Sequence, residues 1–336
     1  MTKILNDVLT IDADSKAEVV NKVADIMREH FVFPETGEKM SDFVLSRFAE
    51  GEYNSYNEIK LFCAKLTADL RSICHDKHLF VFYSPEEAIE VRAAKNLLSE
   101  AETAKFKAMY KLWYERQNFG FQKVEILKGN IGYLKLDTFP GIRGADTCIS
   151  AMGFLANTNA IIIDLRDNGG GEGLDGILSS YFFTAEKVLL GTAKYRDPAL
   201  NTETWTLPYI PGKRLPEIDL YILTSSRTFS AAEGFAYDLQ QLKRAVIVGE
   251  TTKGGAHPID VLIVKGDILT QVPIGCSYNP ITKTNWEKTG VMPDIVTSDE
   301  AALKTAHITA LEKVIGKIGD EEYKKQLSKV LEGLKV

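Results

Sequence analysis

Residues 223–233, LTSSRTFSAAE, bring three serines and two threonines to a place where a hydroxyl could act as a nucleophile. The run IDLYILTSS before it is typical of a buried strand, and SAAEGFAYDLQQLK after it is typical of a helix. Ser230 would therefore stand at a strand-to-helix turn, where backbone N–H groups and the helix dipole could stabilise an oxyanion. A neutral hydroxyl is a poor nucleophile, so such a serine would also need a base.

The same letters fit a purely structural role. S-A-A-E matches a capping box, with Ser230 as the N-cap and Glu233 at position N3 reaching back to the backbone. Taken alone, the stretch favours this capping interpretation. The pattern G-x-S-x-G is absent, so the turn is not the nucleophile elbow of the α/β hydrolases.

A second candidate turn is DLRDNGGGEG, residues 164–173, which follows the apolar run AIII. The spacing G-x-G-x-x-G is absent and no G-K-[ST] follows, which argues against a dinucleotide fingerprint and a P-loop. Two alternatives remain: a loop whose amides face a nearby oxyanion, or a tight turn that only glycine can make. Asp164 and Arg166 are expected to pair across the strand end.

Candidate bases are few, because the chain has five histidines: His30, His75, His78, His257 and His307. His78 lies where a predicted helix passes into a strand, and His257 follows a strand and two glycines. Either could face Ser230, and the residues alone leave the choice open. A base must be oriented by a third group, for which Glu287 in NWEKTGVMPDI is the candidate; the alternative is an ordinary surface glutamate.

The elements that must position these residues fall into two regions. Residues 1–118 are predicted to form a helical domain, with Ser15 as N-cap of its first helix and a short strand within HLFVFYS. Residues 119–336 alternate strand, helix and strand, which predicts an α/β domain with a mainly parallel sheet of βαβ units and a C-terminal helix from Glu300. Function in such sheets lies where strands end and helices begin.

Composition narrows the classes of protein. The 336 residues are 45% apolar and 26% charged, which is typical of one large or two ordinary soluble domains. A net charge of −6 argues against a nucleic-acid partner. No apolar run is long enough to span a bilayer, and no apolar leader opens the chain, which favours a cytoplasmic location, or export if a leader has been removed.

The cysteines suggest neither a metal site nor a disulfide framework. None of them forms a C-x-x-C pair, so we expect buried, reduced thiols at all four positions: Cys63, Cys74, Cys148 and Cys276.

Five stretches taken in order resemble one family. They are DKHLFVFYS, NFGFQKVEILKGNIGYLKLDTF, AIIIDLRDNGGG, LTSSRTFSAAEGFAYDLQQLKRAVIVGETTKGGAHP and NWEKTGVMPDI. Together they are similar to the serine peptidases that include the carboxy-terminal processing (tail-specific) peptidases, the core of tricorn protease and the repeats of interphotoreceptor retinoid-binding protein. The resemblance covers roughly residues 30–300 and implies a crotonase/ClpP-like α/β fold.

Two departures from the pattern of the processing peptidases indicate which branch of that family the chain resembles more. The processing branch pairs its serine with a lysine in a GKG setting, where this chain has Gly255, with Lys253 two residues early. That branch also inserts a PDZ domain, for which residues 85–119 are too short. Both departures favour the tricorn and retinoid-binding-protein branch.

The resemblance to that branch implies specific roles. Ser230 would be the nucleophile, His78 the base and Glu287 a member of the relay; the extra relay serine of tricorn would fall on Lys77. Amides near Gly170 and of Ala231 would hold the oxyanion, and no metal or cofactor is implied.

The expected function is hydrolysis of peptides or unfolded chains through an acyl-enzyme. The alternative is a non-catalytic module of the same fold that binds retinoids or fatty acids. The complete set of Ser230, His78 and Glu287 favours the enzyme.

Overall fold

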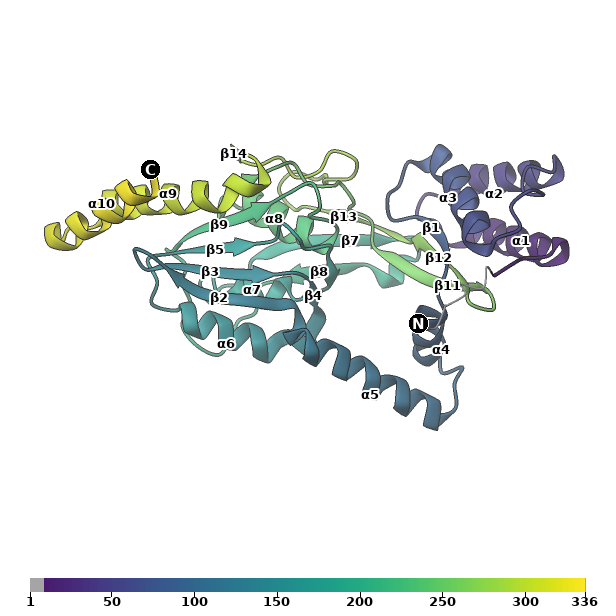
Figure 1. The fold of residues 1–336 in the computed structure, drawn as a ribbon, viewed down its shortest axis with the longest axis horizontal. Coiled ribbons are helices and arrows are strands. Elements are labelled where there is room, and N and C mark those ends of the chain that lie inside the picture. Colours follow the sequence, from purple (N-terminus) through teal and green to yellow (C-terminus); the bar gives the residue numbers. More distant parts are fainter. Residues whose placement is uncertain (1–8, 336) are drawn as a thin grey trace, which may run out of the picture. The chain divides into compact units, whose positions relative to one another are not determined.

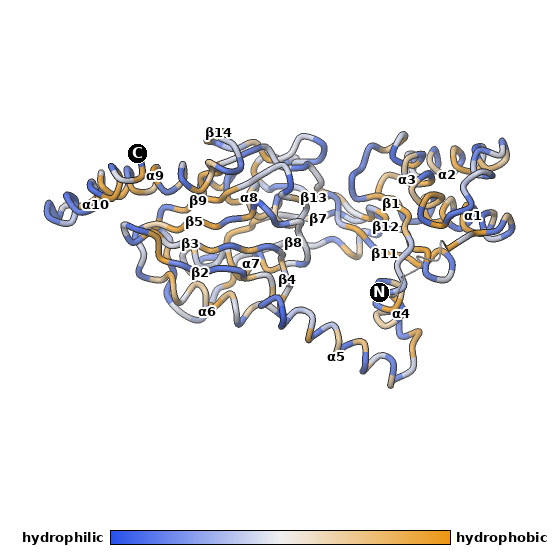
Figure 2. Tube along the Cα trace, in the orientation of Figure 1, coloured by the Kyte–Doolittle hydropathy of each residue, from blue (hydrophilic) through white to orange (hydrophobic). Residues whose placement is uncertain are grey.

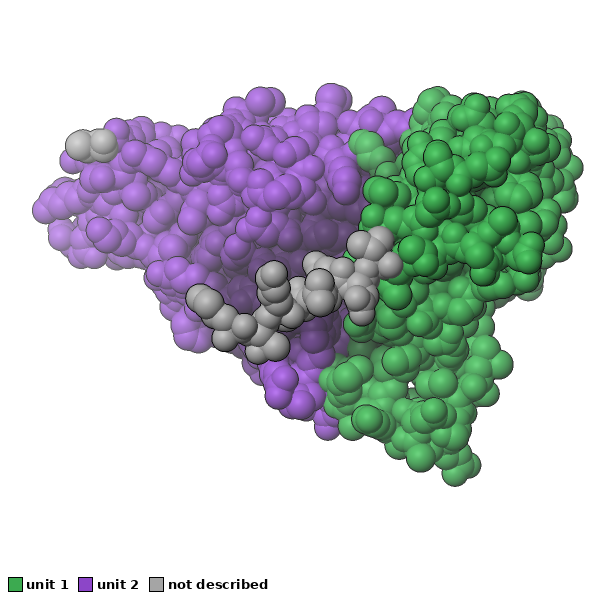
Figure 3. All heavy atoms as spheres, turned by 45° about the vertical axis from the view of Figure 1, so that its right-hand side comes forward, with its two compact units in different colours: residues 1–110, 193–201, 257–276 green, residues 111–192, 202–256, 277–336 purple. Residues whose placement is uncertain are grey.

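The computed structural model describes residues 9–335, and these form two compact units (Figures 1 and 3). Unit 1 contains the chain up to Tyr110 together with residues 193–201 and 257–276, and unit 2 contains the remainder. The chain first passes from unit 1 to unit 2 after Tyr110. The domain boundary expected at residue 118 stays a prediction. Residues 1–8, where a leader was sought, lie outside the described residues.

Unit 2 is built on a six-stranded sheet in the order β14-β10-β9-β5-β3-β2. All neighbours pair in parallel except β2 and β3, which form an antiparallel hairpin. The mixed α/β fold with a mainly parallel sheet is thereby confirmed. The strands have these bounds: β2 (Phe121–Leu127), β3 (Ile131–Leu136), β5 (Ala160–Asp164), β9 (Asp219–Thr224), β10 (Val246–Gly249) and β14 (Ile295–Val296).

Helices cover both faces of this sheet. Alternate residues of a strand point to opposite faces, so each face contributes to a core of its own. Ile161, Ile163 and Ile222 face one core with α6 and α8, while Ile162 and Tyr221 face the other with α9. Figure 2 shows β5 and β9 as largely hydrophobic, as a strand buried on both faces requires. The helices of unit 2 have these bounds: α6 (Ala145–Leu155), α7 (Asp175–Ser180), α8 (Ala231–Gln241), α9 (Asp299–Lys317) and α10 (Glu321–Lys335).

Unit 1 combines a helical bundle with a small sheet. Its helices α1 (Ala13–His30), α2 (Pro34–Ala49) and α3 (Ile59–Cys74) confirm the helical N-terminal region. The predicted N-cap Ser15 is wrong by one turn: Asp12 is the N-cap, and its carboxylate accepts from the Ser15 N–H at 2.7 Å. Sequence favoured Ser15 because it directly precedes the apolar stripe, whereas the helix begins earlier.

A late hairpin completes unit 1. Strands β11 (Ile259–Lys265) and β12 (Ile268–Pro273) form a hairpin, and β12 also pairs antiparallel with β1 (Phe80–Tyr83). Their apolar side chains join the core of the N-terminal helices. A segment some 180 residues later in the sequence therefore packs with the N-terminal bundle, which no local pattern indicates.

The remaining elements are short or connect the two units. Helix α4 (Pro85–Ala94) packs on the β11–β12 hairpin, and α5 (Glu100–Arg116) leads toward the hairpin of β2 and β3. Two further sheets, which sequence patterns did not predict, are formed by these strands: β4 (Phe139–Pro140) with β6 (Gly171–Glu172), and β7 (Leu189–Tyr195) with β8 (Thr202–Trp205) and β13 (Gly275–Tyr278).

Candidate active site

Ser230 lies in a strained turn between β9 and α8. It is the N-cap of α8 with φ of 56° and ψ of −121°, a left-handed backbone region that residues other than glycine rarely adopt. Such a conformation costs about 1–3 kcal/mol and persists only where its surroundings hold it. Strain of this kind holds a nucleophile exposed in an elbow turn, and it is present here although the elbow motif is absent from the sequence.

The serine turn is bound to the glycine turn that follows β5. The Phe229 N–H donates to the Asn168 carbonyl at 3.0 Å, and the Thr228 hydroxyl donates to the Leu165 carbonyl at 2.8 Å. The Ser225 hydroxyl donates to the Arg166 carbonyl at 2.6 Å. The two turns singled out from the sequence therefore lie side by side, because β5 and β9 are parallel neighbours in the sheet.

Gly170 makes the closest approach to the serine. A Cβ added at Gly170 would lie 2.7 Å from the Ser230 Cβ and 3.1 Å from the Ala231 nitrogen, and its φ is 102°. The glycine is needed here for both reasons, since a side chain would be strained and would collide with the candidate nucleophile. The expected nearness of Gly170, Ser230 and Ala231 is thus seen in the structure.

The two predicted oxyanion donors differ in their hydrogen bonding. The Gly170 N–H donates to the Asn168 Oδ1 at 2.8 Å, so it would have to leave that acceptor to bind an oxyanion. The Ala231 N–H opens helix α8, where backbone donors have no intrahelical partner, and no described residue accepts from it. Ala231 is therefore the better placed donor in this structure.

Glu233 is buried at the centre of this arrangement. Its carboxylate accepts from the Ser230 N–H at 2.8 Å, which is the N3 half of the expected capping box. It also accepts from the Thr252 hydroxyl at 2.5 Å, the Gly254 N–H at 2.6 Å and the Gly255 N–H at 2.9 Å. Burial raises the pKa of Glu233, and these four hydrogen bonds oppose that rise.

Glu287 meets the same loop one residue further along. Its Oε2 accepts from the Ala256 N–H at 2.7 Å, and the indole N–H of its neighbour Trp286 donates to the Gly255 carbonyl at 2.8 Å. Three successive amides, those of residues 254–256, thus point at two carboxylates. Glu287 is partly buried and bonded to the loop, which argues against the alternative of an unconstrained surface glutamate.

Lys253 does not have the surroundings of a catalytic lysine. It is exposed, and its ammonium lies 4.4 Å from the centre of the Phe229 ring. A lysine that acts as a general base is ordinarily desolvated, whereas this ammonium is exposed and lies over an aromatic face.

Both candidate histidines lie in unit 1, on either side of Asp76. The Asp76 Oδ1 accepts from the His78 N–H at 2.8 Å and lies 3.8 Å from the His78 Nδ1. The Asp76 Oδ2 lies 2.5 Å from the His257 Nδ1. Burial raises the pKa of Asp76, but the hydrogen bond and charge of His257 and the His78 N–H outweigh it, so this pKa lies below its ordinary value.

Sequence reasoning missed Asp76, although its position two residues before His78 in HDKH was a usable signal. All three side chains of this cluster are buried. The imidazole and carboxylate are groups that zinc also prefers, but Asp76 and His257 direct these atoms at each other.

The structure therefore brings together Ser230, Gly170 and Ala231 in unit 2, with Glu287 on a neighbouring loop of the same unit. His78 belongs to unit 1, and its pairing with Ser230 stays a prediction. The expected pair of Asp164 and Arg166 is formed at 2.7 Å, and the Tyr133 hydroxyl also donates to Asp164. All four cysteines are buried, as predicted, and the described residues contain no disulfide bond.

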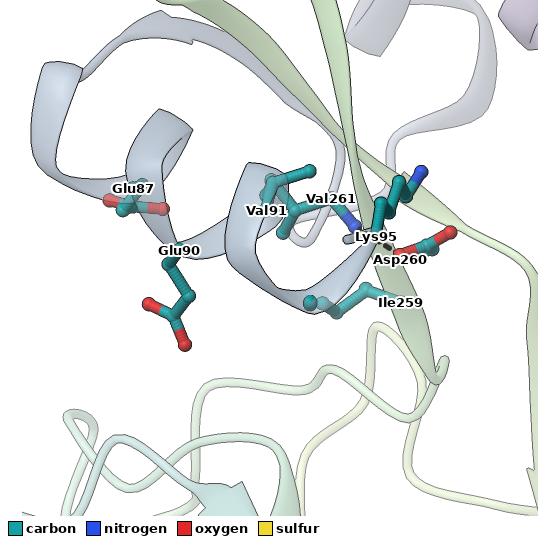
Figure 4. A pocket seen from close by; sticks show the side chains of 8 residues that line it. Glu87, Glu90, Val91, Lys95, Ile259, Asp260 and Val261 are labelled. Atoms are coloured by element: carbon teal, nitrogen blue, oxygen red, sulfur yellow. Dashed lines mark hydrogen bonds between the residues drawn. The ribbon is translucent and has the colours of Figure 1, made fainter. Parts of the chain in front are cut away.

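A concave site in unit 1 is separate from these residues. Figure 4 shows Glu87, Glu90 and Val91 of α4 beside Ile259 and Asp260 at the start of β11. The lining combines charged side chains of both signs with apolar ones, and it contains none of the predicted catalytic residues.

No helix among residues 9–335 combines the length and the apolar character that crossing a bilayer requires.

Two family models match the chain. The model described as peptidase family S41 matches residues 130–297, which is half of the chain. The model described as the N-terminal domain of peptidase S41 in eukaryotic IRBP matches residues 6–111.

Curated relatives match over part of their length. The chain is 30% identical over 169 residues to carboxyl-terminal-processing peptidase 2 (chloroplastic) of Arabidopsis thaliana, covering 49% of this chain and 31% of that protein. It is 25% identical over 229 residues to the tricorn protease of Thermoplasma volcanium, covering 66% of this chain and 20% of that protein. The chain thus spans about a third or less of each.

Solved structures share the fold. A candidate peptidase from Parabacteroides merdae matches with a TM-score of 0.62 at 18% identity, covering 90% of this chain and 99% of that one. A tricorn protease structure matches with a TM-score of 0.53 at 12% identity, covering 96% of this chain and 37% of that one.

Proposed function

Because the chain belongs to peptidase family S41, we propose that it is a serine peptidase that hydrolyses peptide bonds through an acyl-enzyme on Ser230. The observation that carries this proposal is the geometry of one turn. Ser230 is held at a positive φ, with the Gly170 backbone against its Cβ and the Ala231 N–H beside it without an acceptor among the described residues.

In the proposed mechanism, the Ser230 Oγ attacks the substrate carbonyl carbon while His78 removes its proton. The Ala231 N–H, with an amide of the Gly170 turn, holds the resulting oxyanion. His78 then gives the proton to the leaving amine, and water hydrolyses the acyl-enzyme with His78 again acting as the base. Glu287 orients the relay.

The choice of His78 comes from the family resemblance and is supported by Asp76. A carboxylate that accepts from the His78 backbone and lies 3.8 Å from its Nδ1 fixes the residue and favours the imidazolium that forms during proton transfer. His257 is the alternative base. Its Nδ1 bond to Asp76 at 2.5 Å is the arrangement that usually orients a catalytic imidazole through its other nitrogen.

The proposed substrates are peptides or unfolded protein chains, consistent with curated relatives named for processing carboxyl termini. The test is hydrolysis of unfolded casein and of a mixed library of fluorogenic peptides by the wild type and by Ser230→Ala. We expect turnover by the wild type and its loss in the variant, with the circular dichroism spectrum unchanged.

Turnover that survives Ser230→Ala would refute the assignment. A folded wild type that hydrolyses nothing but binds fatty acids or retinoids in a saturable manner would instead support the non-catalytic alternative.

A further inference from the structure

We propose that Glu233 is a positioning residue for the Ser230 nucleophile, whose carboxylate locks the serine turn to the loop formed by residues 252–255. This inference rests on the proposed function of Ser230. It assigns to Glu233 a role beyond that of a helix cap.

A helix cap needs only one of the bonds that Glu233 makes. In a capping box, the N3 carboxylate accepts from the N-cap amide, as Glu233 does from Ser230. Three further donors come from residues about twenty positions later: the Thr252 hydroxyl, the Gly254 N–H and the Gly255 N–H. The side chain thus joins the serine turn to the loop of residues 252–255.

Its burial shows that these bonds are needed. Glu233 has 0% exposure, and a carboxylate without water must have its oxygens satisfied by protein donors. Each of its two oxygens accepts two hydrogen bonds, so protein donors take the place of water at both oxygens. Removing one acceptor leaves a buried N–H unsatisfied rather than exposed to water.

The position of the serine depends on this lock. A positive φ at a residue with a side chain is unfavourable unless its neighbours hold it. Gly170 lies against the Ser230 Cβ, and Glu233 holds the Ser230 N–H. The next amide, that of Ala231, donates to no described residue and is therefore open to an oxyanion.

The loop side of the lock has a second consequence. After Gly254 and Gly255 the chain continues to Ala256, whose N–H is held by Glu287. Glu233 therefore fixes the loop to which the proposed relay carboxylate is attached. A displacement of about 1 Å at such a point can reduce a rate by about 100-fold.

The test is Glu233→Gln. In either orientation its amide places an NH₂ group against at least one backbone N–H, because the two oxygens it replaces accept from Gly254 on one side and from Ser230 and Gly255 on the other. We expect a fall of about 100-fold in kcat and in the rate of fluorophosphonate labelling of Ser230, with KM nearly unchanged.

The control is Asp294→Asn, the same carboxylate-to-amide change outside the site. Its carboxylate also bonds a backbone amide, that of Ile247 at 2.8 Å, and a side chain, that of Gln240. It makes no bond to the serine turn. Because Asp294 is exposed whereas Glu233 is buried, we expect a smaller loss of stability and a labelling rate within about threefold of the wild type.

Thr252 provides a second, milder pair. Thr252→Val removes one donor to Glu233 and is expected to slow labelling about tenfold, whereas Thr252→Ser keeps the hydroxyl and should restore the wild-type rate. If Glu233→Gln does not fold, this pair tests the positioning role of Glu233. Slow labelling of Thr252→Val together with wild-type labelling of Thr252→Ser supports that role, and wild-type labelling rates for both variants overturn it.

The two hypotheses fail in different ways. If the wild type is not labelled at Ser230, the proposed function fails whatever Glu233 does. If the wild type is labelled and a folded Glu233→Gln is labelled at the same rate and has the same kcat, Ser230 remains the nucleophile and the positioning role of Glu233 is overturned.

Discussion

Replacement of Gly170 by alanine would test how tightly the serine turn is held. The added Cβ would lie 2.7 Å from the Ser230 Cβ and 3.0 Å from the Phe229 carbonyl oxygen. Carbon atoms pack at about 3.5–4.0 Å, so Ser230 would have to move by about 1 Å. In addition, the φ of 102° is one that alanine adopts only with strain.

The expected magnitudes follow from these two effects. Overpacking costs about 1–3 kcal/mol, and a left-handed backbone at a residue with a side chain costs about 1–3 kcal/mol more. We therefore expect Gly170→Ala to lower the free energy of unfolding by about 2–6 kcal/mol. A shift of the nucleophile by about 1 Å predicts a loss of about 100-fold in kcat.

The assay compares Gly170→Ala with its neighbour Gly169→Ala by urea denaturation and by peptide hydrolysis. An added Cβ at Gly169 meets no atom within 4 Å, and its φ is not positive. We expect Gly169→Ala to change stability by no more than about 0.5 kcal/mol and to keep its activity. Equal stability and equal activity in the two variants would refute the steric reasoning.

Three further predictions follow from the site. Lys253→Met should keep peptide hydrolysis within about threefold of the wild type, because the exposed ammonium over Phe229 is not a base; a loss of 100-fold or more would restore a serine–lysine dyad. Asp76→Asn should cost about 2 kcal/mol at pH 7. Because the pKa of Asp76 is lowered in the folded protein, its stabilisation is present above the unfolded-state pKa of about 3.9 and is lost as the pH falls through the folded-state pKa. Urea denaturation should therefore show the difference in stability between the variant and the wild type shrinking below about pH 4, and a difference that is constant with pH would contradict this. Asp164→Asn should lower the free energy of unfolding by about 3 kcal/mol, because it leaves the guanidinium of Arg166 without its buried partner, and a thermal midpoint equal to that of the wild type would contradict it.

Much of the fold of unit 2 follows from local pattern. The apolar runs of β5 and β9, each followed by a turn and a helix, predict parallel strands because such runs are buried on both faces of a sheet. The glycine turn and the serine turn were singled out for the same reason, since each follows a strand of that sheet. Their closeness results from the parallel pairing of β5 with β9.

The parts that local pattern could not predict depend on distant contacts. The pairing of the β11–β12 hairpin with β1 joins segments far apart in the sequence. The sequence does not point to Asp76, because an aspartate beside a helix end is ordinarily exposed, and only the fold shows it buried between His78 and His257. The letters S-A-A-E predict only a capping role for Glu233, because its three further donors belong to the distant loop of residues 252–255.

The base was likewise undetermined by the residues. His78 and His257 contact the same carboxylate from opposite sides, so both remain reasonable in chemical terms. The resemblance favours His78, and the variants His78→Ala and His257→Ala can distinguish them.

The most direct test of the account is labelling with a fluorophosphonate probe, followed by peptide mapping, in the wild type, Ser230→Ala, His78→Ala and His257→Ala. The account predicts an adduct on Ser230 of the wild type, none in Ser230→Ala, loss of labelling in His78→Ala, and labelling that persists in His257→Ala. Loss in His257→Ala with full labelling of His78→Ala would transfer the role of base to His257. An unlabelled Ser230 in folded wild-type protein would contradict the central claim that this serine is an activated nucleophile.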